Sequence, residues 1–218
     1  MTFRRTLLSI AAAATMAALV HLPASAQQAI KLTATAGHPP VFLWVKTMDE
    51  VFIPEVDKRL AAAGNKYKIE WTKAWGGTLI KLGGESKGVA DGIADIGLVN
   101  TIFEAAKFPL HNVTYYTPFG SDDVALVSRT ISDLQNKIPA MADVWSKNGL
   151  TYLNGMALDS YHVWTKFPIT KIEDLQGKKL SAPGPAANWV KGTGAVAVAG
   201  NLNTYYEDIK SGVSDGAV

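Results

Sequence analysis

Strand-like and helix-like segments alternate along the first hundred residues, and this alternation constrains the fold more than any other feature. Residues 30–36 alternate apolar with polar side chains, as a half-buried strand does. Residues 41–60 instead place their large apolar side chains on one helical face, and residues 68–74 alternate again. A further helix is predicted at about 78–89 and a buried strand at 94–99. Strand, helix, strand, helix, strand is the order that builds a parallel sheet.

The pattern changes in the middle of the chain. Residues 110–119 are rich in aromatic side chains and are predicted to be extended. Residues 121–123 are expected to cap a long helix that Pro139 bends. Residues 150–158 and 161–166 are rich in residues that favour strands.

The order typical of a parallel sheet begins again after about residue 158. A short strand is predicted at 178–182 and the start of a helix at 186–191. A later helix is expected to be capped by Asn201 or Asn203. We therefore expect two α/β lobes.

Two similar motifs support that division, GVADG at 88–92 and GVSDG at 212–216. In both places a helix is expected to end on glycine before an Asp-Gly turn leads into a strand, although ordinary loop chemistry would produce the same pattern. The second motif lies at the end of the sequence. We therefore predict an N-terminal α/β lobe at 27–155 and an incomplete second α/β lobe at 156–218.

The first 26 residues are expected to be a cleavable export signal. Arg4-Arg5 provides a basic start, residues 7–20 are apolar, and Ala24-Ser25-Ala26 is a small-residue cleavage site. A membrane anchor is the alternative, but the apolar run is shorter than the roughly 20 residues that cross a bilayer, and Pro23 interrupts it. We expect a periplasmic protein with no direct membrane insertion.

Composition excludes several classes of function. The 218 residues include no cysteine, which removes disulfide scaffolds, thiolate metal sites and cysteine nucleophiles. Removing the leader with its two arginines leaves basic and acidic residues equal in number, so no basic surplus favours nucleic acid as a partner. The sequence also lacks a Gly-x-Ser-x-Gly elbow, a His-Glu-x-x-His pair and a phosphate-binding loop. No catalytic residue, metal or cofactor is predicted.

Short motifs are spread over nearly the whole chain that follows the leader. They are WGGTL at 75–79 with GGE at 83–85, GVADG at 88–92 with ADIG at 94–97, TPFG at 117–120, KFPI at 166–169 with EDLQGKKL at 173–180, and GVSDGA at 212–217. In this order and spacing the chain resembles the DctP-like substrate-binding proteins of TRAP transporters. Members of that family are usually longer, so the chain resembles a fragment of one.

The resemblance implies a fold and a function. The fold is the two-lobe periplasmic binding protein fold, with mainly parallel sheets and a hinge between the lobes. The implied function is a receptor, not an enzyme, that captures a small organic anion and delivers it to the membrane permease subunits of a TRAP transporter. We expect a carboxylate with an aromatic or bulky body. An exported enzyme on an α/β hydrolase-like frame is one alternative, and a solute-binding sensor subunit is another.

Candidate ligand-binding residues lie in the loops expected at the carboxyl ends of strands, where such receptors form their sites. They combine aromatic and polar side chains: His38, Trp75, Asn100, Phe103, Phe119, Tyr161, His162, Ser181, Pro183 and Trp189.

Several of these candidates also have a purely structural interpretation. His38 could be a turn residue and Asn100 a helix cap, while the aromatic side chains could pack within a lobe. Because neighbouring side chains in a strand point to opposite faces, only one of Tyr161 and His162 is expected to face the cleft.

Ser181 departs from the pattern of the family. Most members carry at this position an arginine that clamps the ligand carboxylate through a bidentate salt bridge. Lys179, two residues earlier on the same strand face, is one expected substitute. The free amides of a helix starting near Ala187 are another.

Overall fold

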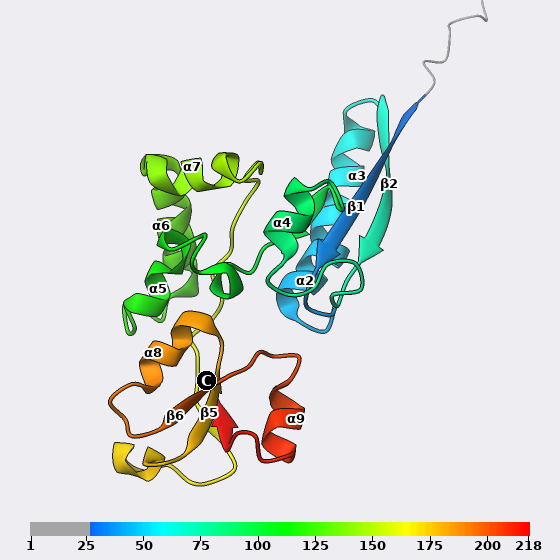
Figure 1. The fold of residues 1–218 in the computed structure, drawn as a ribbon. Coiled ribbons are helices and arrows are strands. Elements are labelled where there is room, and N and C mark those ends of the chain that lie inside the picture. The colour runs from blue at the N-terminus through cyan, green and yellow to red at the C-terminus, as the bar shows by residue number, and fades with distance from the viewer. Residues whose placement is uncertain (1–26) are drawn as a thin grey trace, which may run out of the picture.

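Residues 27–218 are described by a computed structural model, drawn as a ribbon in Figure 1. The expected export signal at 1–26 lies outside the described residues. The described chain contains a three-stranded and a four-stranded sheet. In Figure 1, β1 and β2 of the first sheet and β5 and β6 of the second lie in different parts of the molecule, each with its own helices. This is the two-lobe α/β organisation that the sequence predicts.

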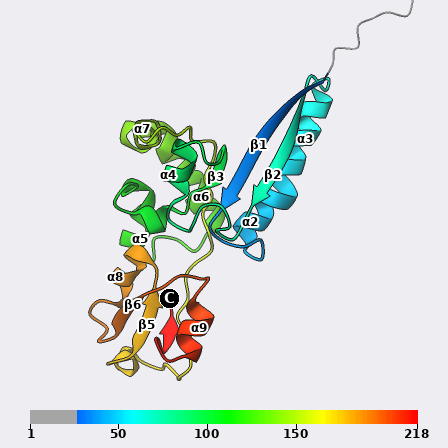
Figure 2. The ribbon, with the colours of Figure 1, turned by 45° about the vertical axis from the view of Figure 1, so that its right-hand side comes forward.

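The first sheet has the order β2-β1-β3, and its strands are all parallel. They are β1 (Gln28–Ala36), β2 (Tyr67–Ala74) and β3 (Ile96–Leu98), which confirms the three strands predicted in this region. Helix α3 (Ile53–Ala62) packs on β2, and α4 (Glu85–Ala90) packs on β3, as Figure 2 shows.

The predicted helix at 41–60 changes its winding in the middle. Helix α2 (Leu43–Thr47) passes into a π-helical turn at Met48–Phe52 and then into α3. Pro54 has no N–H to donate to the preceding turn, and the wider π turn lies directly before it. The expected kink therefore takes the form of a π-helical turn. The apolar face packs against the buried Ala34 of β1.

The helix predicted at 78–89 is shorter than expected, because α4 begins only at Glu85. Gly77 and Gly83 have φ angles of +70° and +81°, which a right-handed helix does not contain. Residues 78–84 form turns instead, so the first half of that prediction is wrong.

The prediction that residues 110–119 are extended is also wrong. A 3-10 turn at Leu110–Asn112 continues into α5 (Val113–Tyr116). The side-chain amide of the buried Asn112 donates to the carbonyl oxygens of Thr101 and Phe108, both at 2.9 Å. These two bonds hold the chain in a compact turn.

Two helices replace the single bent helix that was expected next. Helix α6 (Val124–Lys137) begins after Asp123, whose carboxylate accepts from the backbone N–H of Leu126 at 2.9 Å. Ile138 is extended because it precedes a proline, and α7 (Pro139–Lys147) starts on that proline. Pro139 therefore separates two helices.

Residues 150–158 contain no strand, although their composition predicts one. Every residue from 149 to 163 lines the main cleft of the described structure. The backbone of residues 150–158 therefore borders the cleft and pairs with no neighbouring strand. Only β4 (Trp164–Thr165) follows from the second predicted β-rich stretch.

The second sheet has the order β4-β7-β5-β6, in which only β4 is antiparallel to its neighbour. Strand β5 (Lys179–Ala182) confirms the predicted strand, and it pairs with β6 (Val196–Ala199) and β7 (Gly216–Ala217). Short 3-10 helices at Ile172–Leu175 and Gly184–Ala186 lie on either side of β5.

The helices of the second lobe are short. Helix α8 (Ala187–Val190) confirms the predicted helix start. Helix α9 (Tyr205–Lys210) has Thr204 as its N-terminal cap, so the predicted caps Asn201 and Asn203 are wrong. Asn201 instead contributes its backbone carbonyl, which accepts from the N–H groups at 204 and 205.

The two lobes repeat one local arrangement, but in a register different from the predicted one. The carboxylate of Asp95 accepts from the backbone N–H of Thr33 at 2.7 Å, and that of Asp215 accepts from Lys179 at 3.0 Å. Each aspartate thus joins the last strand of a helix–strand unit to the adjacent strand. The repeat therefore aligns Asp215 with Asp95 and not with Asp91.

Candidate functional site

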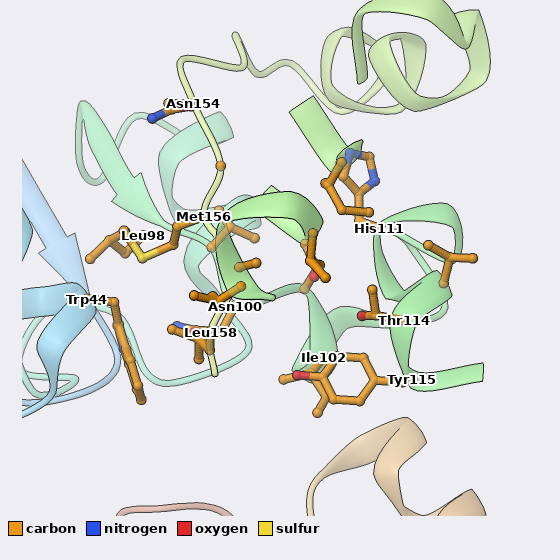
Figure 3. Close-up of a pocket in the computed structure, with 18 of the residues that line it drawn as sticks. Trp44, Leu98, Asn100, Ile102, His111, Thr114, Tyr115, Asn154, Met156 and Leu158 are labelled. Carbon is orange, nitrogen blue, oxygen red and sulfur yellow. The ribbon is translucent and has the colours of Figure 1, made fainter. Parts of the chain in front are cut away.

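A large open cleft lies among the carboxyl end of β3, helix α5, residues 149–163 and helix α8. Its volume is about 2400 Å³, whereas pockets that enclose small ligands usually measure about 300–1,000 Å³. Figure 3 shows Trp44, Asn100 and Tyr115 arranged around part of this space, with Met156 and Leu158 on the crossing segment. Apolar and aromatic side chains form most of its wall.

Five of the ten predicted site residues line the cleft, namely Asn100, Phe119, Tyr161, His162 and Trp189. Their role in binding stays a prediction. Tyr161 and His162 both reach the cleft, so the expectation that only one of them could do so is wrong. That expectation assumed a strand, and residues 150–163 are not in one.

His38 is buried away from the cleft lining. It is 2% exposed, and its ring lies 5.2, 5.3 and 5.9 Å from the ring centroids of Phe42, Trp44 and Phe103. Neither ring nitrogen has a hydrogen-bond partner among the described residues. Burial lowers the pKa of His38 to about 4, so the ring is neutral at neutral pH.

Trp75, Phe103 and Pro183 also lie outside the cleft lining. Trp75 packs against the core of the first lobe, and Phe103 packs on His38. Pro183 is buried directly before the 3-10 turn at Gly184–Ala186. A role of these three residues in binding stays a prediction.

Ser181 is completely buried in β5, and its hydroxyl has no partner among the described residues. A Cβ atom added at Gly200 would lie 3.1 Å both from the Ser181 Cβ and from the Tyr205 ring. Because the surroundings of Ser181 are this tightly filled, an arginine there would displace its neighbours. The expected substitute Lys179 donates to the carbonyl of Gly212 at 3.1 Å and does not line the cleft.

Three aromatic rings meet where the two lobes join. The rings of Tyr115 and Trp189 stack with centroids 5.5 Å apart, and Tyr161 meets the Trp189 ring edge-on at 5.2 Å. The Trp189 indole N–H donates to the Tyr115 carbonyl at 2.7 Å, which links the lobes directly. The Tyr115 and Tyr161 hydroxyls are hydrogen-bonded at 2.9 Å. We call Tyr115, Tyr161 and Trp189 the junction cluster.

Tyr115 is the member of the junction cluster that sequence reasoning missed. The run Thr114-Tyr115-Tyr116 marked the segment as aromatic, but the assumed extended backbone gave no means of choosing one tyrosine. Burial raises the pKa of Tyr115 and of Tyr161, so both hydroxyls stay protonated.

The cleft lining carries little positive charge. In the described part of the chain, Arg59 is the one lysine or arginine on its lining, and Arg59 is already paired with Glu55, Nε to Oε1 at 3.0 Å. The side-chain nitrogens of Trp44 and Asn100, both lining residues, are buried without partners among the described residues.

Neither a metal site nor a membrane span emerges from residues 27–218. Within this range, no group of three or more metal-ligating side chains is close enough to hold an ion. No helix in this range combines the length and apolar character needed to cross a membrane.

Comparisons with known proteins agree on one family. The model of the family "DctP: Bacterial extracellular solute-binding protein, family 7" matches residues 61–218. A TRAP periplasmic solute-binding protein from Desulfovibrio salexigens is 26% identical, with a TM-score of 0.67 over 86% of this chain and 56% of that chain.

Two further solved structures share the fold. An extracytoplasmic solute receptor from Bordetella pertussis that binds pyroglutamic acid is 21% identical, with a TM-score of 0.70 over 86% of this chain and 60% of that one. A TRAP periplasmic solute-binding protein from Bordetella bronchiseptica with bound (R)- and (S)-mandelate is 24% identical, with a TM-score of 0.66 over 86% and 57%.

The chain thus spans less than two thirds of the length of these solved structures. The family model nevertheless covers well over half of the chain itself. The chain belongs to the DctP family of bacterial extracellular solute-binding proteins, family 7.

Proposed function

We propose that this protein is the periplasmic receptor of a TRAP-type transporter. It captures a small organic acid in the cleft and releases it, chemically unaltered, to the membrane permease subunits. The observation that carries the proposal is the cleft at the junction of two α/β lobes, walled mostly by apolar and aromatic side chains. Such a concave, mostly apolar site with few polar groups is typical of small-molecule binding.

The proposed ligand class is supported by what related proteins bind. Structures that share this fold contain pyroglutamate, mandelate, β-D-galacturonate or 3-hydroxybenzoate, all of them small organic acids. A cleft of about 2400 Å³ is wider than such an acid requires. Enclosing the acid therefore requires the lobes to approach each other, and we place the division between them near residue 155.

A calorimetric titration with a panel of acids tests the proposal. The panel contains 3-hydroxybenzoate, mandelate and pyroglutamate, and each acid is recovered after incubation and identified by mass spectrometry. We expect at least one acid to bind with saturation and to be recovered unchanged. Failure of every acid to bind, or conversion of a bound acid into a product, would contradict the proposed receptor function.

A further inference from the structure

The two tyrosine hydroxyls of the junction cluster share one hydrogen bond, which leaves one hydroxyl proton without an acceptor among the described residues. The Tyr115 and Tyr161 hydroxyls lie 2.9 Å apart, and either oxygen can be the donor. Two phenol groups carry two protons, and a single hydrogen bond between them uses one. Whichever tyrosine donates to the other, the second hydroxyl keeps a proton that can point elsewhere.

That remaining proton belongs to a group that lines the cleft. Tyr115 and Tyr161 are both lining residues, and no other described residue accepts from either hydroxyl. Each hydroxyl stays protonated, because burial raises the pKa of both tyrosines. The pair therefore offers a permanent, uncharged donor at the place where the two lobes meet.

Two other lining residues, Trp44 and Asn100, have buried side-chain nitrogens without partners among the described residues. The Trp44 indole nitrogen can only donate, and the Asn100 amide nitrogen carries two protons. The spare proton of the tyrosine pair matches a ligand group that only accepts, and an ionised carboxylate is such a group. The acidic lining residues are Glu55, Asp95, Asp122 and Asp159, and each would repel an anion from its own position. Glu55 is paired with Arg59, whereas Asp159 lies on the same segment as Tyr161.

The space that an arginine clamp would occupy is filled. Ser181 is completely buried next to Gly200 and the Tyr205 ring, and Lys179 is bonded to Gly212 outside the cleft. In the described residues, the cleft lining has no unpaired lysine or arginine to replace that clamp.

The ring geometry indicates the body of the ligand. Tyr115 stacks on Trp189 at an interplanar angle of 21°, while Tyr161 stands at 81° to the same indole. Stacked and edge-on contacts are the arrangements that aromatic rings prefer, so this wall suits a further ring. We propose that the Tyr115–Tyr161 hydroxyl pair, set in the junction cluster, holds the carboxylate of an aromatic acid with uncharged donors in place of an arginine clamp.

This inference rests on the proposed receptor function and names its ligand class and a specificity-determining residue, Tyr115. The test compares the single variants Tyr115→Phe and Tyr161→Phe with the double variant, using 3-hydroxybenzoate as the probe. Each single variant keeps one hydroxyl with a free proton, so we expect a severalfold loss of affinity. The double variant should lose roughly 10- to 100-fold, as for a hydrogen bond to a charged acceptor.

Two controls separate binding from structure. Tyr206→Phe makes the same change on an exposed tyrosine of α9 and should leave the affinity unchanged. The amide 3-hydroxybenzamide keeps the ring but lacks the charge, so the double variant should reduce the preference for the acid over the amide. A purely structural defect would weaken both compounds alike.

Salt dependence provides an independent readout. An uncharged donor set predicts less than about a twofold change in affinity for 3-hydroxybenzoate between 50 and 500 mM NaCl, because salt screens charges and not phenol hydroxyls. A steep loss of affinity with salt, or an unchanged affinity in the double variant, would overturn the inference while leaving the receptor function intact.

If pyroglutamate binds and 3-hydroxybenzoate does not, the aromatic ligand class is wrong. If no acid binds, the proposed function fails and the inference with it.

Discussion

His38 shows how the burial of a single residue creates a dependence on pH. The unfolded chain takes up a proton on His38 near pH 6.5, whereas the folded chain keeps this ring neutral down to about pH 4. The stability that depends on the neutral ring is therefore complete above pH 6.5 and is lost as the pH falls through this window.

We predict that the His38→Leu variant loses less stability on acidification than the native chain. The shift corresponds to at most about 3 kcal/mol in the free energy of unfolding at pH 4. Urea unfolding of both chains at pH 8, 6 and 4 measures the effect, and pH 8 is the control because the native ring is neutral there. Identical pH profiles for the two chains would show that burial of His38 has no such effect.

Glu85 is a second residue whose role comes from burial. It is completely buried, and its carboxylate accepts from the backbone N–H groups of Gly37 and Gly83, at 3.0 and 2.7 Å. These bonds join the loop after β1 to the start of α4. Burial raises the pKa of this carboxyl despite the two bonds.

We predict that Glu85→Gln destabilises the fold by about 1–3 kcal/mol, because the amide turns an NH₂ group toward one of the two backbone donors. Glu207→Gln on the surface of α9 is the matched control and should change stability by less than about 0.5 kcal/mol. Thermal unfolding of both variants measures the difference. Equal melting temperatures would contradict the role assigned to Glu85.

Residue identity alone pointed to some of these positions but could not place them. His38 and Asn100 were recognisable as polar residues after strands, yet only the packing shows that His38 is buried and that Asn100 lines the cleft. The filled space around Ser181 depends on Gly200 and Tyr205, which lie about twenty residues away. Contacts of this kind leave no local pattern in a sequence.

At the scale of elements, the 3-10 turn at Gly184–Ala186 forms one of the contacts between the lobes. Gly184 has a φ of +44°, and a Cβ atom there would collide with the backbone carbonyl of Ile102 in the first lobe. Gly192 has a φ of +80° but nothing within 4 Å of an added Cβ. The two glycines differ mainly in this close approach.

We predict that Gly192→Ala costs about 1 kcal/mol from backbone strain alone. Gly184→Ala should cost roughly 2–4 kcal/mol, since the collision adds to a similar strain. Chemical denaturation measures both, and limited proteolysis within 149–163 should be faster in Gly184→Ala if the lobes separate. Equal costs for the two variants would show that the contact with Ile102 is unimportant.

Elements with a strong period were predictable, and elements fixed by distant contacts were not. The alternation at 30–36 and 68–74 gave β1 and β2 to within two residues at each end. Residues 150–158 have the composition of a strand but line the cleft. The 110–119 turn depends on the amide of Asn112, which reaches back to Thr101.

At the scale of the whole molecule, the two-lobe α/β fold was predictable because the order of elements restarts after about residue 158. The junction between the lobes was not predictable, since it depends on Tyr115, Trp189 and Asn203 meeting groups far away in the sequence. Asn203 donates weakly to the carbonyl of Gly37, at 3.4 Å. We propose that the lobes move relative to each other at this junction when a ligand binds.

Small-angle X-ray scattering of the protein with and without saturating 3-hydroxybenzoate tests the central claim most directly. Capture of an acid between two lobes predicts a smaller radius of gyration in the bound state. A control titration with the corresponding amide should produce little change. A radius of gyration that stays the same when the protein is saturated with the acid would contradict the account.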